Sequence, residues 1–213
     1  MEIKTFSYRY AKEILEHPYY ISAYEEITNI CKACPLPIYK GKSKTQPKLD
    51  VVQQIINTYF KIAFSKQGWE EEPLVTPKDF DDSLRGDFRK KFSKNNHDIS
   101  IQIEVEMGNI ASSYRNYFKF QLSYAHKLAD IALLILPCDN LSRRIDSGVA
   151  SYEKTVREIP SADLSITVPI LVIGLDDVGV DEIDIKEIES NLEIVKGQKN
   201  KYKDSHMKLV KKL

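Results

Sequence analysis

Two short apolar runs constrain the fold of this chain more than any other feature of the sequence. The first covers Ile131–Leu136 and the second covers Pro169–Leu175. A run of this length without polar alternation is typical of a β-strand that is covered on both faces, as in a parallel sheet between two layers of helices. The sequence therefore predicts an α/β fold with a central mixed β-sheet sandwiched by helices.

Helical patterns fill much of the remaining sequence, and the first half is predicted to be mainly helical. An early pattern is interrupted at His17-Pro18 and stops at Cys34–Pro37. Apolar residues then recur at helical spacing from Asp50, a plausible N-cap, to Gly68, which supplies the C-terminal stop. A further helix is expected through Tyr152 to Glu158, and the lysine-rich segment 196–213 is expected to be a last helix or a frayed tail.

Length and composition indicate one globular domain. The chain has 213 residues, 42% of them hydrophobic, which is enough for one core, and no repeat or linker divides it. We therefore expect a single domain over residues 1–213. No apolar run approaches the roughly 18 residues of a membrane helix, and Met1–Thr5 lacks the apolar core of a secretory signal. Three cysteines cannot form a disulfide framework, so a cytoplasmic protein that does not bind membranes is expected.

The charges of the chain balance in total but are unevenly distributed. Lys plus Arg and Asp plus Glu each number 31, so composition alone does not indicate a nucleic-acid-binding protein. However, Lys40–Lys48 contains four lysines and no acid, and Lys196–Leu213 contains seven lysines and one acid. A basic face beside an acidic site is one interpretation of this distribution. The other is that these are ordinary solvated surface runs.

The residues with the clearest chemical potential lie in and near a predicted strand. Apolar and polar residues alternate over Ile99–Val105, so Glu104 and Glu106 project from the same face, about 6.6 Å apart. With Asp87 on an adjacent strand or turn, three carboxylates can converge, and a hard divalent cation such as Mg²⁺ relieves their repulsion. The alternative is an ordinary amphipathic strand with solvated glutamates.

Two segments here resemble a known enzyme group. The active-site region of type II restriction endonucleases of the BamHI, BglII and BstYI group is similar, without a gap, to Asp87–Phe92 followed by Glu104–Ser112. The interval of 17 residues between Asp87 and Glu104 is also the same as in that group. Glu106 agrees with the BamHI branch, whereas the BglII and BstYI branch has Gln at this position. The resemblance covers Asp50 to Leu175 and is strongest from Asp87 to Arg115.

The resemblance implies a variant of the PD-(D/E)xK nuclease fold with a catalytic core over about residues 50–175. It implies a homodimer that cleaves both strands of palindromic double-stranded DNA with Mg²⁺ as cofactor. Asp87, Glu104 and the Val105 carbonyl would hold one or two Mg²⁺ ions, and Glu106 would orient or deprotonate the attacking water. One further carboxylate is expected from the group Glu70, Glu71 and Glu72.

The same resemblance implies where DNA is recognised. Asn109 matches a position that contacts the inner A·T pair, Ala111 follows it as a further DNA-binding position, and Arg115 matches an arginine that reads guanine. Asp146 matches a recognition aspartate, while Ser147 replaces an arginine. The implied recognition sequence is a palindrome with a GATC core and an outer pair that is A·T or purine·pyrimidine, such as AGATCT or RGATCY.

Each of these interpretations has an alternative. Gly108-Asn109 is also a favoured turn sequence, and Asp146 and Ser147 are also suitable helix caps. At the level of function, the alternatives are a different PD-(D/E)xK nuclease that repairs or nicks DNA, and a DNA-binding protein without catalytic activity.

Overall fold

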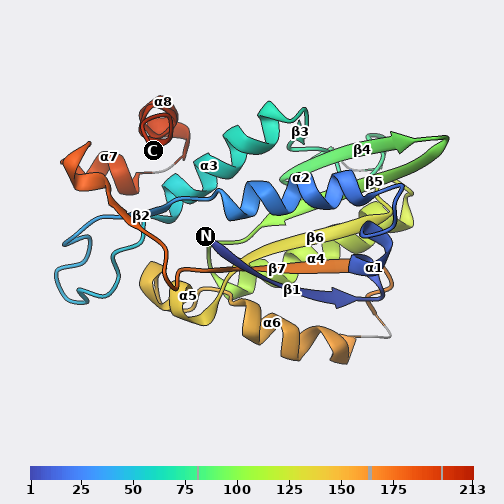
Figure 1. Cartoon of the computed structure of the whole chain (residues 1–213), viewed down its shortest axis with the longest axis horizontal. Helices are drawn as coiled ribbons and strands as arrows, with labels where there is room; N and C mark the ends of the chain where they lie inside the picture. Colours follow the sequence, from blue (N-terminus) through green and yellow to red (C-terminus); the bar gives the residue numbers. More distant parts are fainter. Residues whose placement is uncertain (81, 163–164, 198) are drawn as a thin grey trace.

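A mixed β-sheet forms the centre of this structure, a computed structural model that describes residues 1–80, 82–162, 165–197 and 199–213 (Figure 1). Among the described residues the order across the sheet is β1 (Glu2–Tyr8), β7 (Ile170–Asp176), β6 (Ile131–Pro137), β5 (His97–Val105), β4 (Phe88–Lys94) and β3 (Glu70–Glu71). Strands β5, β6 and β7 are parallel, whereas β1, β4 and β3 run antiparallel to their neighbours. The predicted mixed sheet is thus confirmed.

The two apolar runs form the central strands β6 and β7, and helices cover both faces of the sheet, as predicted. Leu133 and Ile135 of β6 face one core cluster, and Leu134 and Leu136 face the other. Full burial of such a side chain contributes about 1.5–3 kcal/mol. The first cluster includes residues of α2 (Ile21–Lys32), α3 (Gln53–Lys66) and α5 (Asp139–Ile145), and the second includes residues of α4 (Ile110–Ala125) and α6 (Tyr152–Glu158).

The lysine-rich C-terminal segment is helical and packed, so the frayed-tail alternative is wrong. It contains α7 (Leu192–Lys196) and α8 (Lys199–Val210), and α8 is seen end-on at the upper left of Figure 1. Val195 and Leu209 are buried against Val52 and Ile55 at the start of α3. A small parallel sheet of β2 (Leu36–Ile38) and β8 (Glu182–Asp184) connects this part to the remainder of the fold.

The predicted start of one helix is wrong. Helix α3 begins at Gln53 with Val52 as its N-cap, because Asp50 instead binds the guanidinium of Arg144 at 3.0 and 2.9 Å. Helix α4 begins at Ile110, and its N-cap is Asn109. The stop after α3 is confirmed, because Gly68 adopts a φ of +78° that favours glycine.

The N-terminal strand β1 was not predicted. Within the described part of the chain it is an edge strand paired with β7, and its short helical neighbour is α1 (Ala11–Leu15). No helix among the described residues is long and apolar enough to span a bilayer.

Candidate active site

Asp87 and Glu104 lie opposite each other on neighbouring strands. The antiparallel register of β4 and β5 pairs Phe88 with Ile103, so the next pair in the same register is Asp87 and Glu104. The Asp87 Oδ2 atom accepts a hydrogen bond from the Val105 backbone amide at 2.8 Å. Glu106 follows directly after the end of β5. The strand pairing therefore brings together the three carboxylates that the sequence predicted.

Glu104 is buried beside a lysine that projects from α4. Its side chain is 1% exposed, and its Oε2 atom forms an ion pair with Lys119 Nζ at 2.6 Å. Its Oε1 atom accepts a hydrogen bond from Gln102 Nε2 at 3.2 Å. Burial and the charge of Asp87 raise the pKa of Glu104 from its ordinary value of 4.5 to about 8, although Lys119 opposes this shift. Glu104 is thus a carboxylate whose charged form depends on nearby cations.

Glu106 is held by two donors at the end of the strand. Its Oε1 atom accepts from the Gly108 amide at 2.9 Å, and its Oε2 atom accepts from Asn116 Nδ2 at 3.3 Å. Burial raises the pKa of Glu106, and these two hydrogen bonds oppose the shift. A Cβ atom on Gly108 would lie 2.9 Å from Glu106 Oε1, so the absence of a side chain there permits this arrangement. Glu106 is therefore fixed in orientation and a stronger base than a solvated glutamate.

The structure distinguishes the three neighbouring glutamates that the sequence left equivalent. Glu70 forms an ion pair with Arg89 at 3.5 Å. Glu71 is paired with Lys61 at 2.6 Å, and Glu71 and Glu72 line the same pocket as Asp87. The Glu72 amide also donates a hydrogen bond to the Asp87 carbonyl at 3.0 Å. Glu71 and Glu72 are therefore the neighbours placed to support Asp87.

The donor chemistry of this centre fits a hard divalent cation. Asp87 and Glu104 repel each other through a buried environment, and oxygen ligands of this type suit Mg²⁺. Lys119 already provides one positive charge to Glu104. The described ranges contain no preassembled group of three or more His, Cys, Asp or Glu side chains that would hold a metal by themselves. The predicted ligand set of two carboxylates and the Val105 carbonyl is compatible with the structure, and Asp87 and Val105 line the same pocket.

Asn109 caps helix α4 through its side chain. Its Oδ1 atom accepts a hydrogen bond from the backbone amide of Ala111 at 2.8 Å. Asn109 also forms a β-bridge with Val149, and the Ile110 amide donates to the Gly148 carbonyl at 2.9 Å. Asn109 is exposed at this junction, so the cap leaves its amide nitrogen on the molecular surface.

The other predicted recognition residues are exposed close to this junction. Arg115 is exposed in the second turn of α4. Asp146 follows α5, is exposed, and accepts a hydrogen bond from the Ser147 amide at 2.7 Å. Neither Asp146 nor Ser147 caps α6, which begins at Tyr152 with Ser151 as its N-cap. The bridge between Asn109 and Val149 places the segment 146–149 beside the start of α4.

Asn116 and Lys119 of α4 contact the carboxylates and were not predicted from the sequence. Ser113, Asn116, Lys119 and Ser123 are spaced three or four residues apart and so form a polar stripe along one side of the helix. Ser113, Asn116 and Ser123 are buried. A polar stripe on a helix that follows a carboxylate strand is the signal that identifies such partners.

We expect the Lys119→Met variant to lose stability in a pH-dependent manner. At pH 8.5 Glu104 is largely charged beside Lys119, and without this cation it takes up a proton, which forfeits the stabilisation of the charged form, on the order of 1 kcal/mol. At pH 6 Glu104 is largely protonated, so the loss is smaller. Urea unfolding without divalent metal at both pH values measures the difference. Lys127→Met, at an exposed position, is the control, and an equal loss at both pH values would contradict the assigned pairing.

The fold and this centre define a nuclease of the restriction endonuclease class, and comparison with known proteins identifies the family. Residues 3–175 match the model of the family described as restriction endonuclease BglII/BglIII, so the chain belongs to this family. It is therefore a type II restriction endonuclease, a site-specific deoxyribonuclease. Membership favours the nuclease interpretation over the alternative of a non-catalytic DNA-binding protein.

Individual relatives agree with this membership. The chain is 27% identical over 187 residues to the type II restriction enzyme BamHI of Bacillus amyloliquefaciens, covering 83% of this chain and 84% of that enzyme. The crystal structure of restriction endonuclease BglII complexed with a DNA 16-mer is similar with a TM-score of 0.65 at 20% identity, covering 83% of this chain and 77% of that one. Free BglII is similar with a TM-score of 0.55 at 20% identity, covering 82% and 79%. These structures support the α/β restriction-endonuclease-like fold.

Proposed function

We propose that this endonuclease uses Mg²⁺ to cleave both strands of a palindromic DNA site. The observation that carries the proposal is the pairing of Asp87 with Glu104 on adjacent strands, with Glu106 two residues beyond. Three carboxylates in one partly buried place are unfavourable unless positive charge compensates them. A divalent cation compensates this negative charge and so allows the centre to receive a scissile phosphate.

In this proposal Asp87, Glu104 and the Val105 carbonyl hold the cation. When bound, Mg²⁺ would supply Lewis-acid polarisation of the scissile phosphate. The Val105 amide fixes Asp87, and Lys119 fixes Glu104. Glu106 orients the attacking water and accepts its proton at a carboxylate oxygen, a role that its raised pKa favours.

We further propose that the exposed residues near the start of α4 read the DNA sequence. Support comes from BglII, whose similar structure was solved with a DNA 16-mer, and from the shared position of Asn109, Ala111, Arg115, Asp146 and Ser147 around one backbone junction. Asn109 has an amide suited to adenine, and Arg115 has a guanidinium suited to guanine. The proposed site has a GATC core with an outer A·T or purine·pyrimidine pair.

The Asn109→Asp variant separates the two roles of Asn109. Aspartate is an equally good N-cap, so we expect stability to be retained. It lacks the amide donor that adenine N7 requires, so discrimination at the inner A·T pair is expected to fall by about 1–3 kcal/mol. Cleavage rates on duplexes that differ only at this pair measure the effect. If discrimination is unchanged while thermal stability is also unchanged, Asn109 is a cap and not a reader of bases.

We also propose that the protein acts as a homodimer, because a two-fold enzyme presents one active site to each strand of a palindrome. Two large side chains on one face of α4 support this proposal, since Tyr114 is 50% exposed and Phe118 is 59% exposed. Their spacing of four residues places them on the same side of the helix. Sedimentation of the protein is expected to give about twice the chain mass of 24.5 kDa.

Digestion of plasmid and genomic DNA with and without Mg²⁺ tests the proposed function. Discrete double-strand fragments that form only with the metal, and whose ends share a GATC core, are the expected result. Nicked circles would instead indicate a nicking nuclease with the same metal centre. Fragment ends without a GATC core would overturn the assignments of Asn109, Arg115 and Asp146 but not the metal-dependent cleavage.

A further inference from the structure

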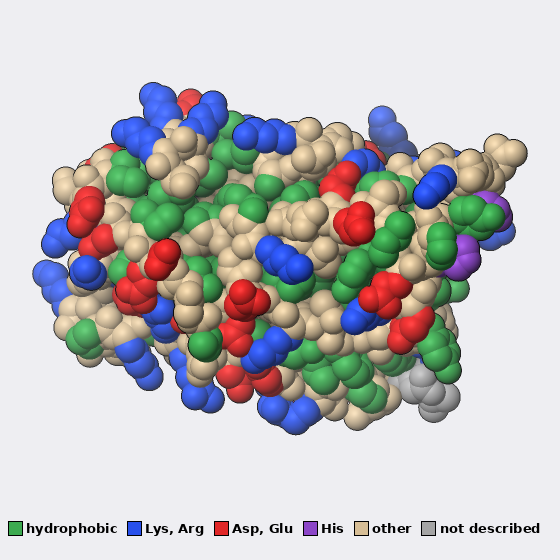
Figure 2. All heavy atoms as spheres, viewed as in Figure 1, with side chains coloured by type: hydrophobic (Ala, Val, Ile, Leu, Met, Phe, Trp, Pro, Cys, Tyr) green, Lys and Arg blue, Asp and Glu red, His purple; other side chains and the backbone are tan. Residues whose placement is uncertain are grey.

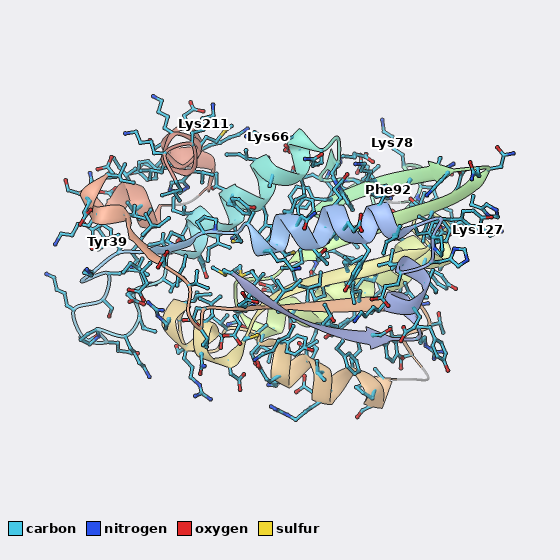
Figure 3. All side chains as sticks on the ribbon, in the orientation of Figure 1. Tyr39, Lys66, Lys78, Phe92, Lys127 and Lys211 are labelled. Carbon is cyan, nitrogen blue, oxygen red and sulfur yellow. The ribbon has the colours of Figure 1, made fainter. Side chains whose placement is uncertain are left out.

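A loop rich in lysine lies beside the segment that we propose to read DNA. We call residues 39–52, between β2 and α3, the lysine loop, which projects at the left of Figure 1 and begins at Tyr39, labelled in Figure 3. Its base is closed by a hydrogen bond from the Tyr39 amide to the Asp50 carbonyl at 2.8 Å and by a bridge between Ile38 and Val51. The lysine loop is therefore a compact surface loop whose two ends are held together by backbone pairing.

Lys42 attaches this loop to the end of α5. Its Nζ atom donates hydrogen bonds to the Val51 carbonyl at 2.5 Å and to the Ile145 carbonyl at 2.9 Å. Ile145 is the last residue of α5 and directly precedes Asp146. The Val51 amide also donates to the Arg144 carbonyl at 3.1 Å. The position of the loop is thus tied to the segment that carries Asp146 and Ser147.

The exposed part of the loop forms one wall of a groove. Lys44 and Lys48 are exposed, and no acidic residue occurs between positions 40 and 49. Lys40 forms a long ion pair with Asp184 at 3.8 Å. Figure 2 shows blue Lys and Arg side chains projecting from this end of the molecule, together with acidic side chains. The groove is lined by Gln46, Lys48 and Leu49 on the loop side and by Asp146, Ser147 and Gly148 among the residues facing them.

We propose that Lys44 and Lys48 bind phosphates of the DNA backbone next to the base pairs that Asp146 and Ser147 face, with Lys42 as a positioning residue that holds the loop there. This inference rests on the proposed function. DNA carries one negative charge per about 1.7 Å of its axis, and a lysine ammonium binds phosphate as a point charge without reading sequence. Lys42 is committed to two backbone carbonyls, which is why it fixes the loop and does not contact the DNA.

The double variant Lys44→Gln and Lys48→Gln tests the inference by DNA binding in Ca²⁺, measured by fluorescence anisotropy over a range of salt concentrations. The probes are a duplex with the enzyme's own cleavage site and a duplex of scrambled sequence. We expect affinity for both to fall, on the order of tenfold at about 0.1 M salt. The plot of log affinity against log salt concentration should become shallower by about 1.8, the value for two lost phosphate contacts.

The matched control is the double variant Lys78→Gln and Lys127→Gln. Both lysines are exposed and lie at the opposite end of the molecule from the lysine loop (Figure 3). This variant should keep the affinity and the salt dependence of the wild type. An unchanged salt dependence in the loop variant would overturn the inference, and so would an affinity loss for the cleavage-site duplex that the scrambled duplex does not share. If the enzyme still cleaves its site, either of these results overturns the inference about the lysines and leaves the proposed function intact. If the wild type shows no metal-dependent cleavage, the proposed function itself is overturned.

Discussion

The Glu104→Gln and Asp87→Asn variants are expected to lose DNA cleavage almost completely while they still bind the cognate site. Each substitution keeps the size of the side chain and removes one of the two charged ligands proposed for Mg²⁺. Metal assistance contributes several kcal/mol to hydrolysis, and a loss of about 4 kcal/mol corresponds to a rate about a thousandfold lower. Single-turnover cleavage gives the rate, and anisotropy in Ca²⁺ gives the affinity.

Glu70→Gln is the matched control for these two variants. Glu70 is close in sequence to the pocket residues but forms its ion pair with Arg89, and it is not among the residues that line the pocket with Asp87. We expect it to cleave at nearly the wild-type rate. Near-normal cleavage by either the Glu104 or the Asp87 variant would show that the metal ligands have been assigned incorrectly.

The affinity for divalent metal is expected to rise steeply with pH up to about pH 8. A cation binds the ionised form of Glu104, and burial next to Asp87 raises the pKa of this residue to about 8. Below that pH a proton competes with the metal, so apparent affinity should fall by up to tenfold per pH unit, or about fiftyfold from pH 8 to pH 6. Calorimetric titration of the protein with Mn²⁺ at several pH values measures this dependence.

The metal-free protein should show the opposite dependence of stability on pH. Because the pKa of Glu104 is higher in the folded protein than its ordinary value of 4.5, the protonated form stabilises the fold at low pH, and this contribution is lost as pH rises from about 4.5 through about 8. In the Glu104→Gln variant both pH dependences should be strongly reduced. A metal affinity that is constant between pH 6 and pH 8 would contradict the assignment of Glu104 as a ligand with a raised pKa.

The central part of the fold was predictable because its residues are governed by burial. The runs that became β6 and β7 have no polar interruption, and the alternation that became β5 has one apolar face. The strand β1 was missed because it lies at the sheet edge, where its residues are only partly buried and the pattern is weak. The start of α3 was misplaced because the carboxylate of Asp50 binds Arg144, a residue 94 positions away, and local sequence contains no sign of that contact.

The candidate site was predictable to the extent that it lies along one strand. Spacing within a strand placed Glu104 and Glu106 together, and Asp87 was added on an adjacent strand or turn. The resemblance to restriction endonucleases supported this set of three. Lys119 and Asn116 were missed because they approach from a different element, and only the packing of α4 against the sheet brings them to the carboxylates. The distinction between Glu70 and its two neighbours likewise required the positions of Arg89 and Lys61.

The backbone pairing between the start of α4 and the segment after α5 links the residues that we propose to read DNA to the residue that we propose to orient the attacking water. The Gly108 carbonyl accepts a hydrogen bond from the Ala150 amide at 3.0 Å, while the Gly108 amide holds the carboxylate of Glu106 at 2.9 Å. A base pair that Asp146 and Ser147 do not accommodate would displace this segment. Gly108, which is hydrogen-bonded to both Ala150 and Glu106, would transmit the displacement to Glu106. Discrimination between correct and incorrect sites would then depend on the rate of hydrolysis as well as on affinity. An incorrect sequence could be bound and still remain uncut.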